Sequence, residues 1–301
     1  MTKVIIIVGP TAVGKTALSI EMAKKFNGEI ISADSVQIYK GLNVGSAKVT
    51  TEEAEGIVHH MIDIIEPTAT FSTGEYSTLA KKAIEKISQK GKTPIIVGGT
   101  GLYVNSILFD LGSTCGRDED YRNHLMEIVN TEGKEKLHKM LEEVDPESAR
   151  ELHINQLDRV IRALEIYHIT GIKKSENKNS TKPNYDYILI GLTDERDILY
   201  NRINQRVDKM MNNGLLDEVQ GLINNGLTLK HQSMQGIGYK ETYAYLTGSC
   251  SKEEFLDKLK QNSRNYAKRQ FTFFKKMPGI IWKKYAEKEE IFKLVGDFIN
   301  E

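Results

Sequence analysis

Residues 4–16 read Val-Ile-Ile-Ile-Val-Gly-Pro-Thr-Ala-Val-Gly-Lys-Thr. The first five are β-branched, a run typical of a strand that is buried on both faces. The remainder match G-x-x-x-x-G-K-T, the phosphate-binding loop, and helical periodicity follows from Ala17 to Lys25. A strand, this motif and a helix in succession predict an α/β fold, in which helices flank a P-loop-type parallel sheet.

The residue types of this loop suit a phosphate or a diphosphate. Backbone N–H groups at a helix N-terminus attract an anion, the lysine adds positive charge near the terminal phosphates, and the last hydroxyl is a ligand for Mg²⁺. A tight strand–helix turn with chance glycines is the alternative, and the matching context disfavours it. We therefore expect Mg²⁺ on Thr16 and a diphosphate held by Gly9, Pro10, Thr11, Ala12, Val13, Gly14, Lys15 and Thr16. The motif does not specify the reaction.

The composition is that of an ordinary globular chain. Of 301 residues, 40% are hydrophobic and 27% are charged, with 41 basic and 41 acidic side chains. A zero net charge neither indicates nor excludes a nucleic-acid partner, because a basic face can exist within a neutral total. The two cysteines, Cys115 and Cys250, have no metal-ligand spacing. With a core strand beginning at residue 4 and no long apolar run, we expect a cytoplasmic protein that does not span a membrane. A monomer is the working expectation.

The next two predicted strands end at the same sheet edge as the loop. The second covers residues 29–32, and Asp34 follows it. Ligands bind outside the carboxyl ends of parallel strands, so Asp34 is either a site residue or a local cap. The strand after residue 93 ends Val97-Gly98-Gly99-Thr100. P-loop hydrolases usually carry an acidic residue there to help hold Mg²⁺, so its absence weakens an ATPase or GTPase interpretation.

The apolar strands are interrupted by a charged helical segment. We predict a core of residues 1–112 and 185–301, and a helical insertion of residues 113–184, whose last twelve residues form a polar linker. In the insertion, Gln156 and Arg159 flank the apolar face of a helix, and a solvated surface is their default interpretation.

The chain after the strand at residues 187–192 is predicted to be helical. Asp194 is a candidate N-cap for a helix that runs to Asn213. Arg202 and Arg206 lie one turn apart on this helix, so they either both face one ligand or form a solvated basic surface. Residues 261–285 contain seven Lys or Arg, no Asp or Glu, and interleaved aromatic residues. This pattern fits a surface for a phosphate backbone, or an amphipathic helix with a solvated basic side on which lie Arg264, Lys268, Lys275 and Lys276.

Nine segments in order resemble the tRNA dimethylallyltransferase family, also called tRNA isopentenyltransferases. The phosphate loop alone is generic, but the ordered set is specific. One mild departure is Ser46, a position at which Thr is commoner in the family; the change keeps a hydroxyl. The matching segments are residues 9–16, Ser32-Ala33-Asp34-Ser35-Val36-Gln37-Ile38-Tyr39, Gly45-Ser46-Ala47-Lys48, His59-His60-Met61-Ile62-Asp63, Gly98-Gly99-Thr100-Gly101-Leu102-Tyr103, residues 156–165, Gly214-Leu215-Leu216-Asp217-Glu218-Val219, Ile237-Gly238-Tyr239-Lys240-Glu241 and Ala267-Lys268-Arg269-Gln270.

The resemblance implies transfer of a dimethylallyl group from its diphosphate to N6 of the adenosine on the 3′ side of a tRNA anticodon. It also implies that the base is flipped into a channel, since a stacked adenine does not present N6 to a buried electrophile. Asp34 is then the general base, Thr11 lies near the bridging oxygen, Lys15 stabilises the leaving group and Arg206 reaches the diphosphate. The resemblance places contacts to the anticodon stem-loop at Asp34, Ser35, Val36, Gln37, Thr100, Gln156, Leu157, Asp158, Arg159 and Val160.

Two other functional classes remain open from the residues. A P-loop small-molecule kinase would use ATP, with Asp34 activating a substrate hydroxyl. A non-catalytic RNA-binding module would bind RNA and turn over neither donor. The basic aromatic segment favours RNA, and the glycine-rich strand end disfavours ATP hydrolysis.

Overall fold

A six-stranded sheet, in which all pairings are parallel, forms the centre of the fold. The computed structural model describes residues 1–110, 116–176, 180 and 182–301. The strand order is β3-β2-β4-β1-β5-β6, which confirms the predicted parallel α/β class. The strands are β1 (Lys3–Val8), β2 (Gly28–Ala33), β3 (His59–His60), β4 (Thr93–Gly98), β5 (Asp186–Thr193) and β6 (Ile280–Lys284).

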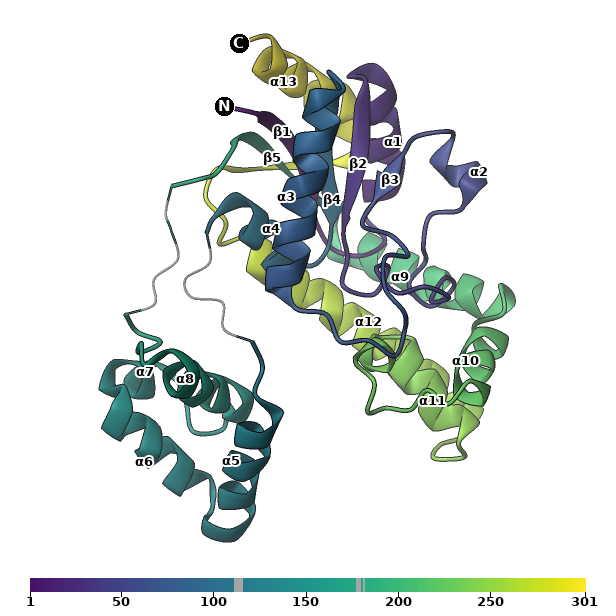
Figure 1. Cartoon of the computed structure of the whole chain (residues 1–301). Helices are drawn as coiled ribbons and strands as arrows, with labels where there is room; N and C mark the ends of the chain where they lie inside the picture. The colour runs from purple at the N-terminus through teal and green to yellow at the C-terminus, as the bar shows by residue number, and fades with distance from the viewer. Residues whose placement is uncertain (111–115, 177–179, 181) are drawn as a thin grey trace. The chain divides into compact units, whose positions relative to one another are not determined.

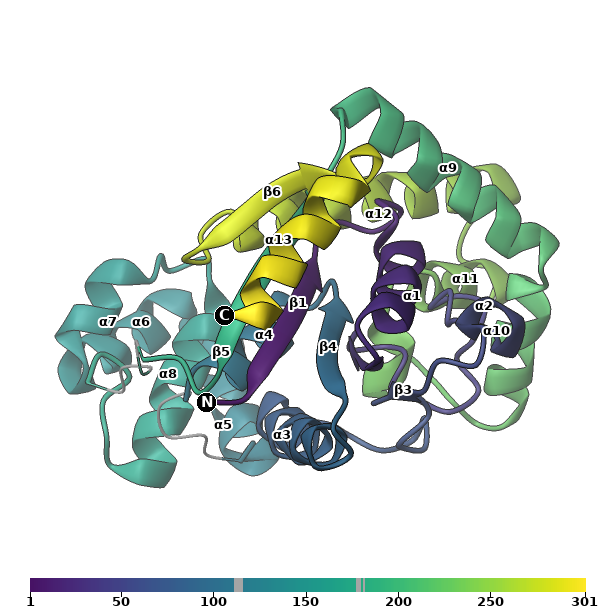
Figure 2. The same ribbon diagram turned by 90° about the horizontal axis from the view of Figure 1, so that it is seen from above.

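Helices cover both faces of this sheet (Figures 1 and 2). On one face lie α1 (Lys15–Lys25) and α13 (Lys288–Asn300), and on the other lie α3 (Thr73–Gln89) and α4 (Gly101–Leu108). Successive strand residues point to opposite faces, so central strands covered on both sides must be apolar throughout. This requirement explains the unbroken Val-Ile-Ile-Ile-Val run of β1.

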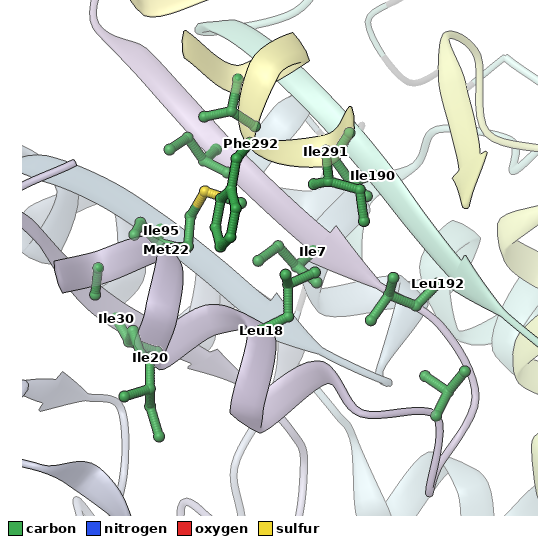
Figure 3. Packing of buried hydrophobic residues seen from close by; sticks show 14 of the residues in the cluster. Ile7, Leu18, Ile20, Met22, Ile30, Ile95, Ile190, Leu192, Ile291 and Phe292 are labelled. Carbon is green, nitrogen blue, oxygen red and sulfur yellow. The ribbon is translucent and has the colours of Figure 1, made fainter. Parts of the chain in front are cut away.

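The core between the sheet and α1 and α13 is built largely from isoleucine and leucine side chains (Figure 3). Ile7 from β1 meets Leu18 from α1 and Ile190 from β5, and all three are fully buried. Phe292 of α13 belongs to the same cluster. The core therefore fixes the start of α1, and with it the phosphate loop, against the sheet.

Truncation of Ile7 to alanine is expected to destabilise the protein by about 2–5 kcal/mol, because it removes buried methyl groups and leaves a cavity. The free energy of unfolding, measured by urea denaturation, tests this value. Leu102→Ala is the matched control, since Leu102 is 57% exposed, and we expect it to change stability by about 0.5 kcal/mol or less. Equal midpoints for the two variants would contradict the assigned core.

The C-terminal part is helical except for one strand. It contains α9 (Arg196–Asn212), α10 (Leu215–Asn224), α11 (Tyr239–Leu246) and α12 (Lys252–Phe274), with the short helices η1 (Gln232–Gln235) and η2 (Tyr285–Glu287). The prediction that everything after residue 192 is helical was wrong for β6, which pairs with β5. The turn at Pro278 and Gly279 separates β6 from α12. β6 begins with Ile-Ile-Trp, a sequence that favours an extended edge strand.

The chain forms two compact units. The first unit consists of Met1–Leu108 and Tyr185–Glu301, and the second unit is Phe109–Asn184. The second contains α5 (Glu119–Glu132), α6 (Lys134–Val144), α7 (Pro146–Glu151) and α8 (Leu157–Thr170) around its own apolar core. The fully buried carboxylate of Glu165 accepts hydrogen bonds from the Arg122 guanidinium, 2.8 and 3.0 Å away. Burial alone would raise the pKa of Glu165, but these bonds, together with those from Arg162 and the Asp118 N–H, lower it to about 2.

Some sequence expectations fall outside the described residues. The predicted boundary at residues 112 and 113 and Cys115 lie in the segment 111–115, and part of the predicted linker lies at 177–179 and 181.

The remaining short elements are α2 (Thr51–Ala54), whose capping box at Thr50 fixes its start, and β3 at the sheet edge. Within the described chain, no helix combines the length and apolarity that a membrane span needs.

Candidate active site

A cavity of about 90 Å³ lies at the carboxyl ends of β1, β2 and β4. The phosphate loop and α1 contribute polar groups to it, and apolar side chains come from β2 and β4 (Ile30 and Val97) and from the loops that carry Val49 and Ile62. Its lining includes Thr11, Lys15, Thr16, Ile30, Asp34, Gln37, Val49, Ile62, Val97, Gly99, Arg206, Tyr266 and Gln270. Of the predicted site residues in the first unit, the structure thus brings six together in the lining of this cavity: Thr11, Lys15, Thr16, Asp34, Gln37 and Arg206.

The backbone of the phosphate loop requires glycine at its two ends. Gly9 has φ 147° and Gly14 has φ 100°, values that L-side chains rarely adopt. A Cβ on Gly9 would also lie 2.5 Å from the carbonyl oxygen of Leu192 in β5. The loop therefore passes close to the neighbouring strand and turns directly into α1, whose first residue is Lys15.

The ammonium of Lys15 folds back over the loop. Its Nζ donates hydrogen bonds to the carbonyl oxygens of Gly9, at 3.0 Å, and Pro10, at 2.7 Å. Burial and, to a smaller extent, the positive charge of Arg206 lower the pKa of Lys15 to about 7, although Asp34 acts in the opposite direction. An arriving anion would favour the charged ammonium, so anion binding and protonation of this lysine are coupled.

The affinity for inorganic diphosphate is therefore expected to fall as the pH rises above about 7. In the free protein Lys15 is neutral above its pKa, so binding an anion requires uptake of a proton, which costs up to about tenfold in affinity per pH unit. Titration calorimetry from pH 6.5 to 9 measures this slope. Lys15→Arg is the control, because a guanidinium stays charged over this range. The same slope in both proteins would exclude Lys15 as its source.

Arg206 and Arg202 are not directed to one ligand, contrary to the first sequence interpretation. Arg206 lines the cavity, and its Nη2 donates to the Ser46 carbonyl oxygen at 3.4 Å. Burial lowers its pKa, which Asp34 partly offsets. Arg202 instead pairs with Asp194 at 2.8 Å on the surface. Asp194 does not cap α9, whose N-cap is Glu195, because the chain leaves β5 one residue later than expected.

Asp34 lies just beyond β2 and lines the cavity. Its Oδ1 accepts hydrogen bonds from the backbone N–H groups of Val36, at 2.9 Å, and Gln37, at 3.3 Å. The sequence left open whether Asp34 is a site residue or a local cap. In the structure it lines the cavity and one of its oxygens is also fixed by a local turn. No donor among the described residues reaches Oδ2, so this oxygen is available to a ligand.

A small network connects the residues that follow Asp34 to the neighbouring elements. The Thr100 Oγ1 accepts a hydrogen bond from the Ser35 N–H at 3.1 Å. The Ser32 hydroxyl donates a hydrogen bond to Oε1 of Gln37 at 3.0 Å, and this bond orients the side-chain amide of Gln37 in the cavity wall. Val36 packs beside this turn, where its side chain closely approaches Gly236.

Gln270 of α12 is a site residue to which sequence reasoning assigned no role. Its Oε1 accepts a hydrogen bond from the Thr11 N–H at 2.9 Å, and its Nε2 donates to the Gly99 carbonyl oxygen at 3.0 Å. It thereby joins the phosphate loop to the end of β4. The available signal was a glutamine in the basic stretch of residues 261–285, within a segment that matched the family. Nearby, burial raises the pKa of Tyr266 to about 12.

The predicted residues 156–160 belong to the second unit and start α8 there. Gln156, Asp158 and Arg159 are exposed, and Leu157 is half-buried. Val160 is 1% exposed and packs in that unit's core, so its side chain is not available to a ligand.

The fold and the cavity define a P-loop-type α/β protein, with an anion cradle beside an aspartate and an apolar wall. The sequence model of the IPP transferase family matches residues 37–277. This chain belongs to the IPP transferase family.

Individual relatives agree with this assignment. The tRNA dimethylallyltransferase of Bacillus pumilus is 49% identical, over 97% of this chain and 95% of its own length. A solved tRNA isopentenylpyrophosphate transferase from Bacillus halodurans is 44% identical, with a TM-score of 0.75 over 100% of this chain and 97% of that chain. A eukaryotic dimethylallyltransferase acting on tRNA is 32% identical, with a TM-score of 0.84 over 100% of this chain and 80% of that chain.

Proposed function

We propose that this protein, acting as a monomer, transfers a dimethylallyl group from dimethylallyl diphosphate to N6 of the adenosine on the 3′ side of a tRNA anticodon. The names of its relatives support dimethylallyl transfer to tRNA. The observation that carries the proposal is a single cavity that joins the phosphate loop to Asp34 and to an apolar wall. Such a cavity suits a donor with a charged end and a hydrocarbon end.

The phosphate loop is proposed to stabilise the leaving group. As the allylic C–O bond breaks, negative charge accumulates on the diphosphate, and donors already in place stabilise it. Lys15 and Arg206 supply positive charge, the backbone N–H groups of residues 12–16 donate hydrogen bonds, and Thr11 lies near the bridging oxygen. The apolar side chains of Ile30, Val49, Ile62 and Val97 then face the dimethylallyl group.

Asp34 is proposed to act as the general base. The N6 amine forms the new C–N bond to the allylic carbon, the C–O bond breaks, diphosphate departs and the N6 proton passes to the carboxylate. The local turn holds Oδ1, so Oδ2 is the oxygen free to accept the proton.

Mg²⁺ fits the donor set of this cavity as a diphosphate-bound cation. Among the described residues no three His, Cys, Asp or Glu side chains gather to hold a metal ion. Mg²⁺ in phosphate sites is commonly bound through one or two protein oxygens and the substrate's own oxygens. The exposed Thr16 hydroxyl, beside Lys15 in the cavity lining, is the proposed protein ligand. When bound, the cation neutralises charge on the diphosphate.

The proposed tRNA surface has three parts. Ser35, Val36, Gln37 and Thr100 surround the turn at Asp34 and would contact the flipped base and its neighbours. In the second unit, the exposed residues among 156–160 would contact the anticodon stem-loop. The third part is a groove of about 490 Å³ along α12, lined by Asn265, Lys268, Arg269, Thr272, Phe273 and Lys276. Its cations suit a phosphate backbone.

The predicted basic side of α12 needs one correction. Arg264 donates to Oδ1 of Asn204 in α9 at 2.7 Å, so it joins two helices. Lys275 follows the last residue of α12. Only Lys268 and Lys276 of the four predicted basic residues line the groove.

A small-molecule kinase is not favoured by the end of β4. A Cβ on Gly98 would lie 2.1 Å from the Ala33 carbonyl oxygen, so no acidic side chain fits where P-loop hydrolases place their second magnesium carboxylate. A Cβ on Gly99 would lie 2.0 Å from Nε2 of Gln270.

The proposal is tested with labelled dimethylallyl diphosphate, unmodified tRNA and Mg²⁺, with no ATP present. We expect label in the tRNA at the adenosine 3′ to the anticodon. Absence of label, together with ATP consumption in the presence of small hydroxylated substrates, would replace the proposal with a kinase. RNA binding without turnover of either donor would indicate a binding module.

A further inference from the structure

The loop between β2 and α2 is held by a carboxylate from a distant helix. Glu218 of α10 accepts hydrogen bonds from the backbone N–H groups of Asn43 at 2.9 Å, Val44 at 2.7 Å and Gly45 at 3.1 Å. Three consecutive N–H groups converging on one side chain form the kind of concavity that binds an anion.

Tyr239 of α11 completes this arrangement. Its hydroxyl donates to Oε1 of Glu218 at 2.7 Å and accepts from the Ser46 N–H at 3.2 Å. Tyr239 is fully buried, and its ring lies 2.6 Å from the position that a Cβ on Gly45 would occupy. Burial and the neighbouring carboxylate raise the pKa of Tyr239, so the hydroxyl remains a donor.

The same loop forms part of the cavity wall. The Ser46 carbonyl oxygen accepts hydrogen bonds from Arg206 and from Nε2 of Gln37, and the Ala47 carbonyl oxygen accepts a second bond from Gln37, all at 3.4 Å. Ala47 and the nearby Val49 line the cavity. The carbonyls that orient two proposed substrate-binding side chains therefore follow directly after the amides that Glu218 holds.

A carboxylate is better suited to this role than an amide. Glu218 receives four hydrogen bonds, three from the backbone and one from the Tyr239 hydroxyl. An ionised carboxylate only accepts, whereas glutamine would turn an NH₂ group toward one or more of these donors. The substitution would leave the helix intact and release the loop.

We propose that Glu218, supported by Tyr239, is a positioning residue for the transfer reaction. It sets the loop of residues 43–47 so that Arg206 meets the diphosphate and Gln37 meets the base, and it contacts neither substrate itself. This inference rests on the diphosphate-binding role proposed for Arg206 and Lys15.

The test compares Glu218→Gln with Asp217→Asn, an adjacent and exposed carboxylate as matched control. The first measurement is affinity for inorganic diphosphate with Mg²⁺ by titration calorimetry, and the second is kcat and KM for dimethylallyl diphosphate. We expect Glu218→Gln to weaken diphosphate binding and raise KM by about 10- to 100-fold, with cooperative unfolding retained. Asp217→Asn should match the wild type. Equal affinities and KM values for the two folded variants would overturn the inference.

Further variants separate positioning from general stability. In an Arg206→Ala background, Glu218→Gln should add little to the loss, because both changes remove the same contact to the diphosphate; full additivity would overturn the inference. If Glu218→Gln does not fold, Tyr239→Phe is measured instead. We expect it to weaken diphosphate binding severalfold, and wild-type affinity would contradict the inference. If Arg206→Ala and Lys15→Ala both keep wild-type affinity for diphosphate, the proposed diphosphate site is refuted. If these two variants lose affinity but Glu218→Gln does not, only the positioning role of Glu218 is refuted.

Discussion

Asp34→Asn is expected to lower kcat for dimethylallyl transfer by about 10²- to 10⁴-fold, the usual contribution of a positioned general base. The asparagine oxygen can still accept from the N–H groups of Val36 and Gln37, which bond Oδ1 of Asp34, so the local turn should persist. The amide cannot take the N6 proton. Binding of tRNA should therefore be nearly unchanged while turnover is lost.

The measurement is single-turnover transfer of label to tRNA, with tRNA affinity determined separately. Asp186→Asn is the control, because this exposed aspartate starts β5 at the opposite end of the strand from the cavity. Near-normal turnover in Asp34→Asn would remove Asp34 from the general-base role. A parallel loss of tRNA affinity and turnover would instead assign it to substrate binding.

Lys15→Met is expected to reduce kcat/KM for dimethylallyl diphosphate by about 10²- to 10³-fold, as for the loss of one preorganised donor to a developing oxyanion. Methionine fills much of the same space without the ammonium, which in the free protein bonds the carbonyl oxygens of Gly9 and Pro10. The loop should keep its fold, since α1 remains fixed by its buried face, including Leu18 and Met22.

Steady-state kinetics with varied dimethylallyl diphosphate checks this value, and Lys24→Met is the control, since Lys24 lies on the same helix and pairs with Glu55 on the surface. A loss confined to KM would mean that Lys15 binds the ground state and transition state equally. Unchanged kinetics in Lys15→Met would contradict its place in the diphosphate site.

Local signals in the sequence were sufficient wherever one segment determines its own structure. The β-branched run of β1 and the glycines of the phosphate loop predicted the strand, turn and helix. The capping box at Ser251 marked the start of α12, and Asp145 before Pro146 marked α7. These features depend on backbone conformation and on hydrogen bonds within a few residues, which residue order already specifies.

Tertiary structure decided what depends on partners distant in the chain. β6 is a strand because the edge of β5 is available to it, and no short window of sequence contains that information. Arg202 and Arg206 share a helix, yet Asp194 holds one at the surface while the Ser46 carbonyl holds the other at the cavity.

The two residues with the least local signal show the same limit most clearly. Gln270 meets the phosphate loop 259 residues away, and Glu218 meets the loop after β2 at a separation of 175 residues. A polar side chain on a helix has the same local pattern whether it faces water or holds a distant backbone. The sequence alone therefore determined the parallel α/β class and the phosphate loop, and folding determined which side chains support that loop, because their hydrogen-bond partners meet only in the folded chain.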